Sequence, residues 1–151
     1  MSHKITVGST APDFKLKDQH GNVVILNELL EKRKVVLFFY PKDQTSGCTA
    51  QVCSFRDSYE ELLAKNVEVL GISSDGEKSH QAFSNKHKLQ YSILSDPGGE
   101  IRKKYQVPNK LFFIPGRVTY LINQNGVIDL IHDAMTDARG HVRVVQEKLS
   151  E

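Results

Sequence analysis

A wholly apolar run that stops at a proline constrains the fold of this chain more than any other feature. The run Val35–Tyr40 (VVLFFY) is rich in β-branched and aromatic residues, which is typical of a strand covered on both faces. Pro41 ends this strand because it has no N–H to donate to a neighbouring strand. Residues 42–47 favour a turn, and a helix that begins near Cys48 is predicted after them. The apolar residues that recur at helical spacing are Val52, Phe55, Tyr59, Leu62 and Leu63.

Cys48 is therefore placed at the N-terminus of a helix, beside a buried strand. A cysteine attacks as its thiolate, and an ordinary thiol with a pKa near ~8.5 is only about 3% ionised at neutral pH. Lowering the pKa of such a thiol to about 6 requires roughly 3.4 kcal/mol of preferential anion stabilisation. A helix N-terminus contributes roughly 0.3 to 1 kcal/mol, and ~2 at most. A nucleophilic cysteine at this position therefore needs a nearby cation as well.

Three basic residues are candidates for that cation. Lys42 is close in sequence, whereas Arg56 lies eight residues along the helix, about 12 Å away, which is too far. Arg117 opens the run 117–122, which has strand character and could face the same sheet edge. The sequence alone does not place Arg117 there.

A second cysteine, Cys53, follows five residues after Cys48. In a continuous helix this spacing gives an axial rise of about 7.5 Å, an angular separation of roughly 140° and a Cα separation of about 8.6 Å. A disulfide requires Cα atoms within about 7 Å. If the two cysteines pair, the first turns of the helix must unwind, as expected for a transient catalytic disulfide rather than a structural one.

Length and composition limit the class of protein. The 151 residues, 39% of them hydrophobic, predict one domain spanning 1–151 with its own core. Mixed charges that sum to +2 suggest neither nucleic acid nor an anionic membrane as a partner. The sequence has no apolar run near the ~20 residues of a membrane span and no recognisable signal peptide. Two cysteines favour a reducing compartment: the cytoplasm, or a plastid or other organelle matrix if a transit peptide has been removed.

Strand and helix patterns alternate along the rest of the chain. The predicted strands are 67–73, 92–95, 117–122 and 127–132, with a short hairpin over 11–26 expected as a peripheral lid. The predicted helices are 28–31 capped by Asn27, 75–87 with Asp75 or a nearby serine as cap, 99–105, and 137–148 capped by Asp137. Asn125-Gly126 is expected to supply the positive φ angles of the last hairpin turn. This order predicts an α/β fold, a thioredoxin-like three-layer α/β/α sandwich with an N-terminal hairpin extension.

The spacing P-x-x-x-T-x-x-C, formed by Pro41, Thr45 and Cys48, resembles that of the peroxiredoxins. With Cys53 five residues on and Phe55-Arg56-Asp57 following, the chain is similar to the Q or bacterioferritin-comigratory subgroup. The resemblance covers nearly the whole chain. Its further motifs are Ala11-Pro12-Asp13-Phe14, Phe39-Tyr40-Pro41-Lys42-Asp43, Leu94-Ser95-Asp96, Gly116-Arg117-x-Thr119-Tyr120 and Asn125-Gly126.

This resemblance implies a thiol peroxidase that reduces hydrogen peroxide and organic hydroperoxides. Cys48 would attack the terminal peroxide oxygen and become a sulfenic acid. Thr45 would hydrogen-bond the peroxide, Pro41 would shield the thiol, and Arg117 would orient the substrate and favour the thiolate. Cys53 would then form a Cys48–Cys53 disulfide, which thioredoxin or a glutaredoxin-like dithiol reduces. The resemblance also suggests a monomer.

Two departures from the subgroup flank the pocket. Position 46 is Ser where Pro is usual, and position 51 is Gln where Glu is common. Neither change removes an atom that the resemblance makes catalytic, but Ser46 could loosen the loop and alter the ease of unwinding.

Other interpretations of the same residues remain. The disulfide could switch a binding surface in a redox sensor, or the chain could be a thioredoxin-like disulfide reductase, which the missing C-x-x-C disfavours. His80 and His87, seven apart on one helix face, are expected to be exposed, and no metal or cofactor is expected. The apolar stretch 111–114 is a candidate wall of the active site or part of the core.

Overall fold

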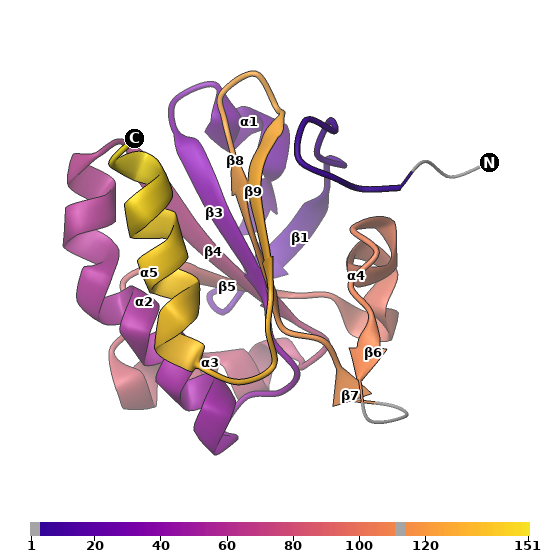
Figure 1. Ribbon diagram of the computed structural model, residues 1–151. Helices are drawn as coiled ribbons and strands as arrows, with labels where there is room; N and C mark the ends of the chain where they lie inside the picture. Colours follow the sequence, from indigo (N-terminus) through magenta and orange to yellow (C-terminus); the bar gives the residue numbers. More distant parts are fainter. Residues whose placement is uncertain (1–3, 111–113) are drawn as a thin grey trace.

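The computed structural model describes residues 4–110 and 114–151 of the chain. The candidate wall at 111–114 therefore lies largely outside the described residues. Seven strands form one sheet in the order β2-β1-β5-β4-β3-β8-β9 (Figure 1). These strands are β1 (Lys15–Asp18), β2 (Val23–Ile25), β3 (Lys34–Phe39), β4 (Val67–Ser73), β5 (Ser92–Ser95), β8 (Val118–Ile122) and β9 (Ile128–Asp133). A separate two-stranded sheet pairs β6 (Asn109–Lys110) with β7 (Ile114–Pro115).

Helices cover both faces of the large sheet. The helices are α1 (Leu26–Leu30), α2 (Ser46–Ala64), α3 (Glu77–His87), a 3₁₀ turn (Pro97–Gly99), α4 (Glu100–Lys104) and α5 (Ala138–Leu149). In Figure 1, α2 and α5 lie side by side on one face of the sheet, and α4 lies beyond the other. The prediction of a thioredoxin-like α/β/α sandwich is confirmed. None of the described helices is long and apolar enough to cross a membrane.

The central strand β3 divides the core in two. Alternate side chains of a strand point to opposite faces, so Val35, Leu37 and Phe39 join the cluster that includes Leu26 of α1. Val36, Phe38 and Tyr40 join the opposite cluster, with residues of α2, α3 and α5. The stripe predicted for the helix after Cys48 enters this second cluster, and the ring of Phe55 stacks on Phe38 with centroids 4.6 Å apart.

Register decides which distant residue meets the start of α2. Strand β8 runs antiparallel to β3, and its last pair at this end is Val118 with Phe39. Arg117 lies one residue beyond that pair, at the end of β3 from which the chain leaves towards α2. The pairing thus brings a residue 69 positions away in sequence to the neighbourhood of Cys48.

The N-terminal hairpin corrects one prediction. Strands β1 and β2 pair in antiparallel register, with Leu16 opposite Val24, as the sequence pattern indicates. Strand β1 also pairs with β5, so the hairpin extends the main sheet at its edge and does not form a peripheral lid. Backbone hydrogen bonds to β5 hold it there because a strand edge left open exposes unpaired N–H and C=O groups.

Capping and turn details also differ from prediction. Asn27 lies inside α1, where its N–H donates to Asp13 Oδ1 at 2.9 Å, so Asp13 satisfies the first turn instead. Asp137 has the N-cap position of α5, but its carboxylate pairs with Arg143. Helix α3 starts after Gly76 without a side-chain cap. In the last hairpin turn only Gly126 has positive φ, because Asn123 accepts N–H groups of that turn through its side chain.

Candidate active site

Cys48 is the third residue of α2, in the first helical turn. The first hydrogen bond within the helix is donated by the N–H of Thr49 to the carbonyl oxygen of Thr45, at 2.8 Å. The N–H groups of residues 46–48 come before that bond and have no acceptor within the helix. Those free N–H groups and the helix dipole favour negative charge at this end. The Cys48 side chain is 1% exposed and packs in the cluster with Tyr40 and Val52. The protein therefore shields this thiol from water.

The cation beside this helical turn is Arg117. Its Nη1 donates to the carbonyl oxygen of Gly47 at 3.1 Å and to Oε1 of Gln51 at 2.7 Å. Its Nη2 lies so close to Gly47 that a Cβ there would meet it at 3.0 Å. Arg117 is 5% exposed, whereas Lys42 is exposed. The structure thus places a buried guanidinium against the first turns of α2, the arrangement that an anionic sulfur requires.

Gln51 holds the guanidinium in place and was not among the predicted site residues. Because Arg117 Nη1 is a donor, Gln51 must face it with Oε1, which fixes the orientation of the amide. The amide Nε2 is buried and has no hydrogen-bond partner among the described residues. A glutamate here would set a negative charge against Arg117, so the neutral glutamine leaves the charge of Arg117 uncompensated by residue 51. Gln51, where the subgroup commonly has glutamate, therefore changes the electrostatics of the site.

The loop between β9 and α5 holds the other side of Arg117. Arg117 Nε donates to the carbonyl oxygen of Met135 at 3.2 Å, and the N–H of Ala134 donates to the carbonyl oxygen of Arg117 at 3.2 Å. The buried His141 fixes this loop, because its Nε2 donates to the carbonyl oxygen of Ala134 at 2.8 Å. Its Nδ1 is then left to accept the hydroxyl proton of Thr119 at 2.8 Å. Nδ1 can accept that proton only while the imidazole is neutral.

We expect acid to destabilise the protein through His141. Burial is the main cause that lowers the pKa of His141, the bond to Ala134 opposes it, and with smaller contributions from His132 and Arg117, which also lower it, the pKa is about 4. The imidazole of His141 takes up a proton near pH ~6.5 in the unfolded chain and only near pH 4 in the folded chain. The free energy of unfolding therefore falls as the pH drops from about 6.5 to about 4. The loss should reach roughly 3 kcal/mol at ~1.36 kcal/mol per pKa unit.

Urea unfolding midpoints between pH 7 and 4 measure this effect. His141→Gln keeps an amide donor for Ala134 but has no titrating group, and we expect it to flatten the pH dependence. His20→Gln, which changes an exposed histidine, serves as the matched control. Equal slopes for the wild type and His141→Gln would contradict the assignment.

Thr45 and Pro41 flank the same turn. Thr45 is the N-cap residue by backbone geometry, with φ −81° and ψ 151°, but its side chain does not cap the helix. Instead its hydroxyl donates to the carbonyl oxygen of Lys42 at 2.9 Å. Pro41 directly follows Tyr40, the last residue that donates to β4. The hydroxyl oxygen of Thr45 thus keeps its lone pairs for a ligand that donates a proton.

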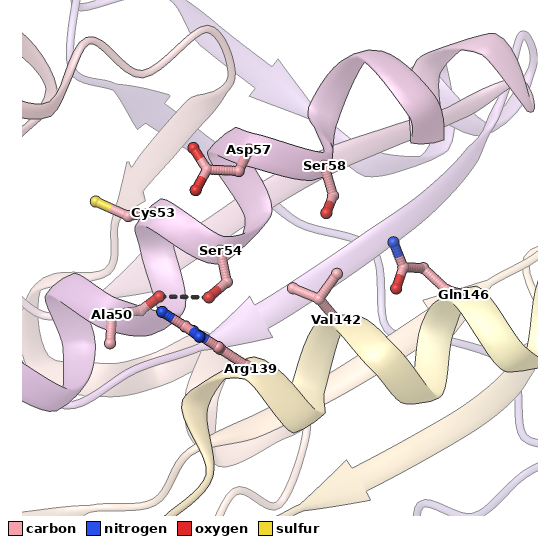
Figure 2. A pocket seen from close by; sticks show the side chains of 8 residues that line it. All are labelled: Ala50, Cys53, Ser54, Asp57, Ser58, Arg139, Val142 and Gln146. Carbon is pink, nitrogen blue, oxygen red and sulfur yellow. Dashed lines mark hydrogen bonds between the residues drawn. The ribbon is translucent and has the colours of Figure 1, made fainter.

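Cys53 lies on the same continuous helix, with its thiol reduced and partly exposed. Burial raises the pKa of Cys53, an effect that Arg56 opposes and Asp57 increases. Cys53 lies at the edge of a groove of about 360 Å³ between α2 and α5, which Arg139 and Val142 also line (Figure 2). In Figure 2 the hydroxyl of Ser54 donates to the carbonyl oxygen of Ala50, at 2.7 Å, a bond that competes with the helical ladder between the two cysteines.

The structure brings Cys48, Thr45, Pro41 and Arg117 to one end of α2, and it keeps Cys53 on the same helix. The prediction that His80 and His87 are exposed is wrong, because His80 is 0% exposed and His87 is half-buried. Sequence reasoning missed the hydrogen-bonding roles of Gln51, His80 and Asp43. For Gln51 the available signal was its position three residues after Cys48, on the same helix face.

Comparison with known proteins gives consistent matches. Residues 7–131 match the family model described as AhpC/TSA family. The chain is 47% identical over 140 residues to peroxiredoxin Q, chloroplastic, of Sedum lineare, covering 92% of this chain and 75% of that protein. It is 49% identical over 140 residues to peroxiredoxin Q, chloroplastic, of Arabidopsis thaliana, covering 92% of this chain and 64% of that protein. The chain thus spans about two thirds to three quarters of the length of these relatives.

A solved structure agrees with the sequence matches. The crystal structure of peroxidoxin BcpB from Mycobacterium tuberculosis superimposes with a TM-score of 0.90 at 30% identity, covering 98% of this chain and 97% of that one. The similarity in fold therefore extends over nearly the whole length of both chains.

Proposed function

Because this chain belongs to the AhpC/TSA family, in its peroxiredoxin Q group, we propose that it is a thiol-dependent peroxidase with Cys48 as the peroxidatic cysteine. The observation that carries the proposal is the buried guanidinium of Arg117, bonded to Gly47 and Gln51 on either side of Cys48. The substrates are hydrogen peroxide and organic hydroperoxides. We take residues 1–151 as one domain.

In the first step the Cys48 thiolate attacks the terminal oxygen of the hydroperoxide. An S–O bond forms, the O–O bond breaks, and the leaving oxygen departs as an alcohol or water after taking a proton. The hydroxyl oxygen of Thr45, whose own proton goes to Lys42, accepts the O–H of the bound peroxide. Arg117 stabilises the charge that shifts onto the leaving oxygen. Pro41 shields the thiol from water.

In the second step Cys53 attacks the sulfenic sulfur of Cys48. A disulfide forms and water leaves, and the first turns of α2 unwind because both cysteines belong to one unbroken helix. The unpartnered Nε2 of Gln51 and the Ser54–Ala50 bond both make this stretch of helix less stable. Unwinding also releases Cys48 from its buried position.

A thioredoxin-type dithiol then reduces the disulfide and becomes oxidised itself. Its thiolate attacks more readily at the sulfur whose departing partner is the better leaving group. The guanidinium of Arg117, held beside the start of α2, favours Cys48 as the departing thiolate. The reductant therefore attacks Cys53, from the side of the groove between α2 and α5, and Cys48 leaves.

The peroxide reaction should be visible in the mass of the chain. One equivalent of hydrogen peroxide should remove two hydrogens from the wild type and link Cys48 to Cys53. In Cys53→Ser the same treatment should add one oxygen, which a dimedone-type sulfenic acid probe captures. Added oxygen without a link in the wild type would contradict the assignment of Cys53.

Turnover separates the enzyme from a redox sensor. A peroxidase consumes many equivalents of peroxide when reduced thioredoxin is supplied, whereas a sensor oxidises once and is reduced slowly.

We place the protein in a reducing compartment, the cytoplasm or the plastid matrix, the latter supported by relatives that are named chloroplastic. We propose a monomer, since Val7 and Val23 are the exposed large hydrophobic side chains among the described residues.

A further inference from the structure

A buried hydrogen-bond network surrounds Asp43, in the loop that joins β3 to α2. Asp43 is 3% exposed, whereas residues 44–47, between it and Cys48, are exposed. Asp43 lies midway between Pro41 and Thr45. It is therefore the point at which this exposed loop is tied to the interior of the protein.

Three side chains converge on the carboxylate of Asp43. The hydroxyl of Tyr40 donates to Oδ1 at 2.6 Å, the hydroxyl of Ser79 donates to Oδ2 at 2.8 Å, and Nδ1 of His80 lies 2.6 Å from Oδ2. Burial and the nearby Asp43 raise the pKa of Tyr40 well above its usual range, so its hydroxyl keeps the proton that it donates. The carboxylate is thus engaged by Tyr40, which directly follows β3, and by two residues of α3.

His80 connects the same carboxylate to the sheet. Its Nε2 lies 3.0 Å from the carbonyl oxygen of Leu94 in β5, and a carbonyl oxygen only accepts, so Nε2 carries a proton. Its Nδ1 and Oδ2 of Asp43 must then share a further proton. Removing either member leaves a buried polar or charged partner unpaired, which is strongly unfavourable.

The backbone of Asp43 is held as well. Its N–H donates to Oδ2 of Asp75 at 2.8 Å, and the same oxygen accepts the hydroxyl proton of Ser73 at 2.7 Å. Asp43, Asp75 and His80 bring potential metal-ligand atoms within 4.8 Å of one another, and these same atoms are engaged in hydrogen bonds with protein groups. Hydrogen bonds between protein groups account for the arrangement. This is a structural network that fixes a loop.

We propose that Asp43 and His80 form a positioning pair that sets the rate at which Cys48 reacts with hydroperoxide. The inference rests on the proposed peroxidase function. The pair fixes Lys42, whose carbonyl oxygen orients the hydroxyl of Thr45, and it fixes the loop that leads into the first turn of α2. Unwinding after oxidation begins beyond this loop, so the pair acts on the peroxide step and not on disulfide formation.

Two variants of His80 separate its two bonds. The amide nitrogen of Asn lies about as far along the side chain as Nδ1, and that of Gln about as far as Nε2. His80→Asn therefore keeps a donor towards Asp43, and His80→Gln keeps one towards Leu94. Because misplacement by about 1 Å can cost ~100-fold in rate, we expect a peroxide rate constant at least ~10-fold lower for His80→Gln than for His80→Asn.

The measurement is the second-order rate constant of Cys48 oxidation by hydrogen peroxide, with every protein carrying Cys53→Ser. Alkylation by iodoacetamide, which makes no use of the peroxide site, should differ much less between the two variants. His87→Gln, on the same helix at a half-buried position, is the matched control and should equal the parent. Equal peroxide rate constants for the two His80 variants, or the reverse order, would overturn the pairing.

Two milder variants test the proposal even if His80→Gln does not fold. Ser79→Ala and Tyr40→Phe each remove one donor to Asp43 and leave His80 intact. If His80→Gln does not fold, unchanged peroxide rate constants in both would sink the inference, and reduced ones would support it. A parent protein that reacts no faster than its Cys48→Ser form would instead refute the proposed function itself.

Discussion

Cys48→Ser will reduce peroxide consumption with reduced thioredoxin to the rate measured without protein. A serine hydroxyl is not ionised at neutral pH, and an alcohol is a far weaker nucleophile towards a peroxide oxygen than a thiolate. The side chains are nearly isosteric and the position is 1% exposed, so we expect the fold to survive the change. Following NADPH oxidation through thioredoxin reductase measures the loss.

Cys53→Ser is the matched control for that experiment. It removes a thiol five residues away on the same helix, and it should stop thioredoxin-coupled turnover while leaving the first oxidation of Cys48 intact. A single-turnover measurement separates the two outcomes. Equal turnover by Cys48→Ser and the wild type would end the peroxidase assignment.

Arg117→Met will lower the rate constant for peroxide reduction by roughly 100- to 1000-fold, the usual effect of removing one preorganised donor from a transition state. The substitution keeps an unbranched side chain in a buried position but removes the charge beside the first turn of α2. It also leaves Oε1 of Gln51 and the carbonyl oxygen of Met135 without their donor, so some loss of stability should accompany it.

Competition against a peroxidase of known rate measures this constant. Arg139→Met serves as the control, because Arg139 is an exposed arginine of α5 at the groove beside Cys53. We expect it to leave the reaction of Cys48 with hydrogen peroxide unchanged. A decrease of less than about threefold in Arg117→Met, with thermal unfolding showing a folded protein, would remove Arg117 from the mechanism.

Most of the fold could be predicted from local patterns. The apolar run Val35–Tyr40 and the helical stripe after Cys48 each predict an element that the structure contains, because periodic burial is written into adjacent residues. Helix ends and turn conformations were predicted less well. Asn27 and Asp137 have the residue types of caps, yet Asp13 bonds the first turn of α1 and Arg143 pairs with Asp137. Such choices depend on competing partners that the local sequence does not contain.

The candidate site shows the same division. The spacing of Pro41, Thr45 and Cys48 indicated where the chemistry lies, since these residues are close along the chain. His80 was predicted to be exposed, together with His87 seven residues along the same helix face. It is buried because β5 supplies a carbonyl oxygen and the loop before α2 supplies Asp43.

The sequence by itself determined a buried strand, a loop ending at a thiol, and a second thiol too far along the same helix to pair without unwinding. Only the tertiary structure decided which cation accompanies that thiol. Antiparallel pairing of β8 with β3 brings Arg117 to the helix start, and Gln51 and the loop at Met135 then fix its guanidinium. The physical reason is that helix geometry is set by neighbouring residues, whereas strand register joins residues that are distant along the chain.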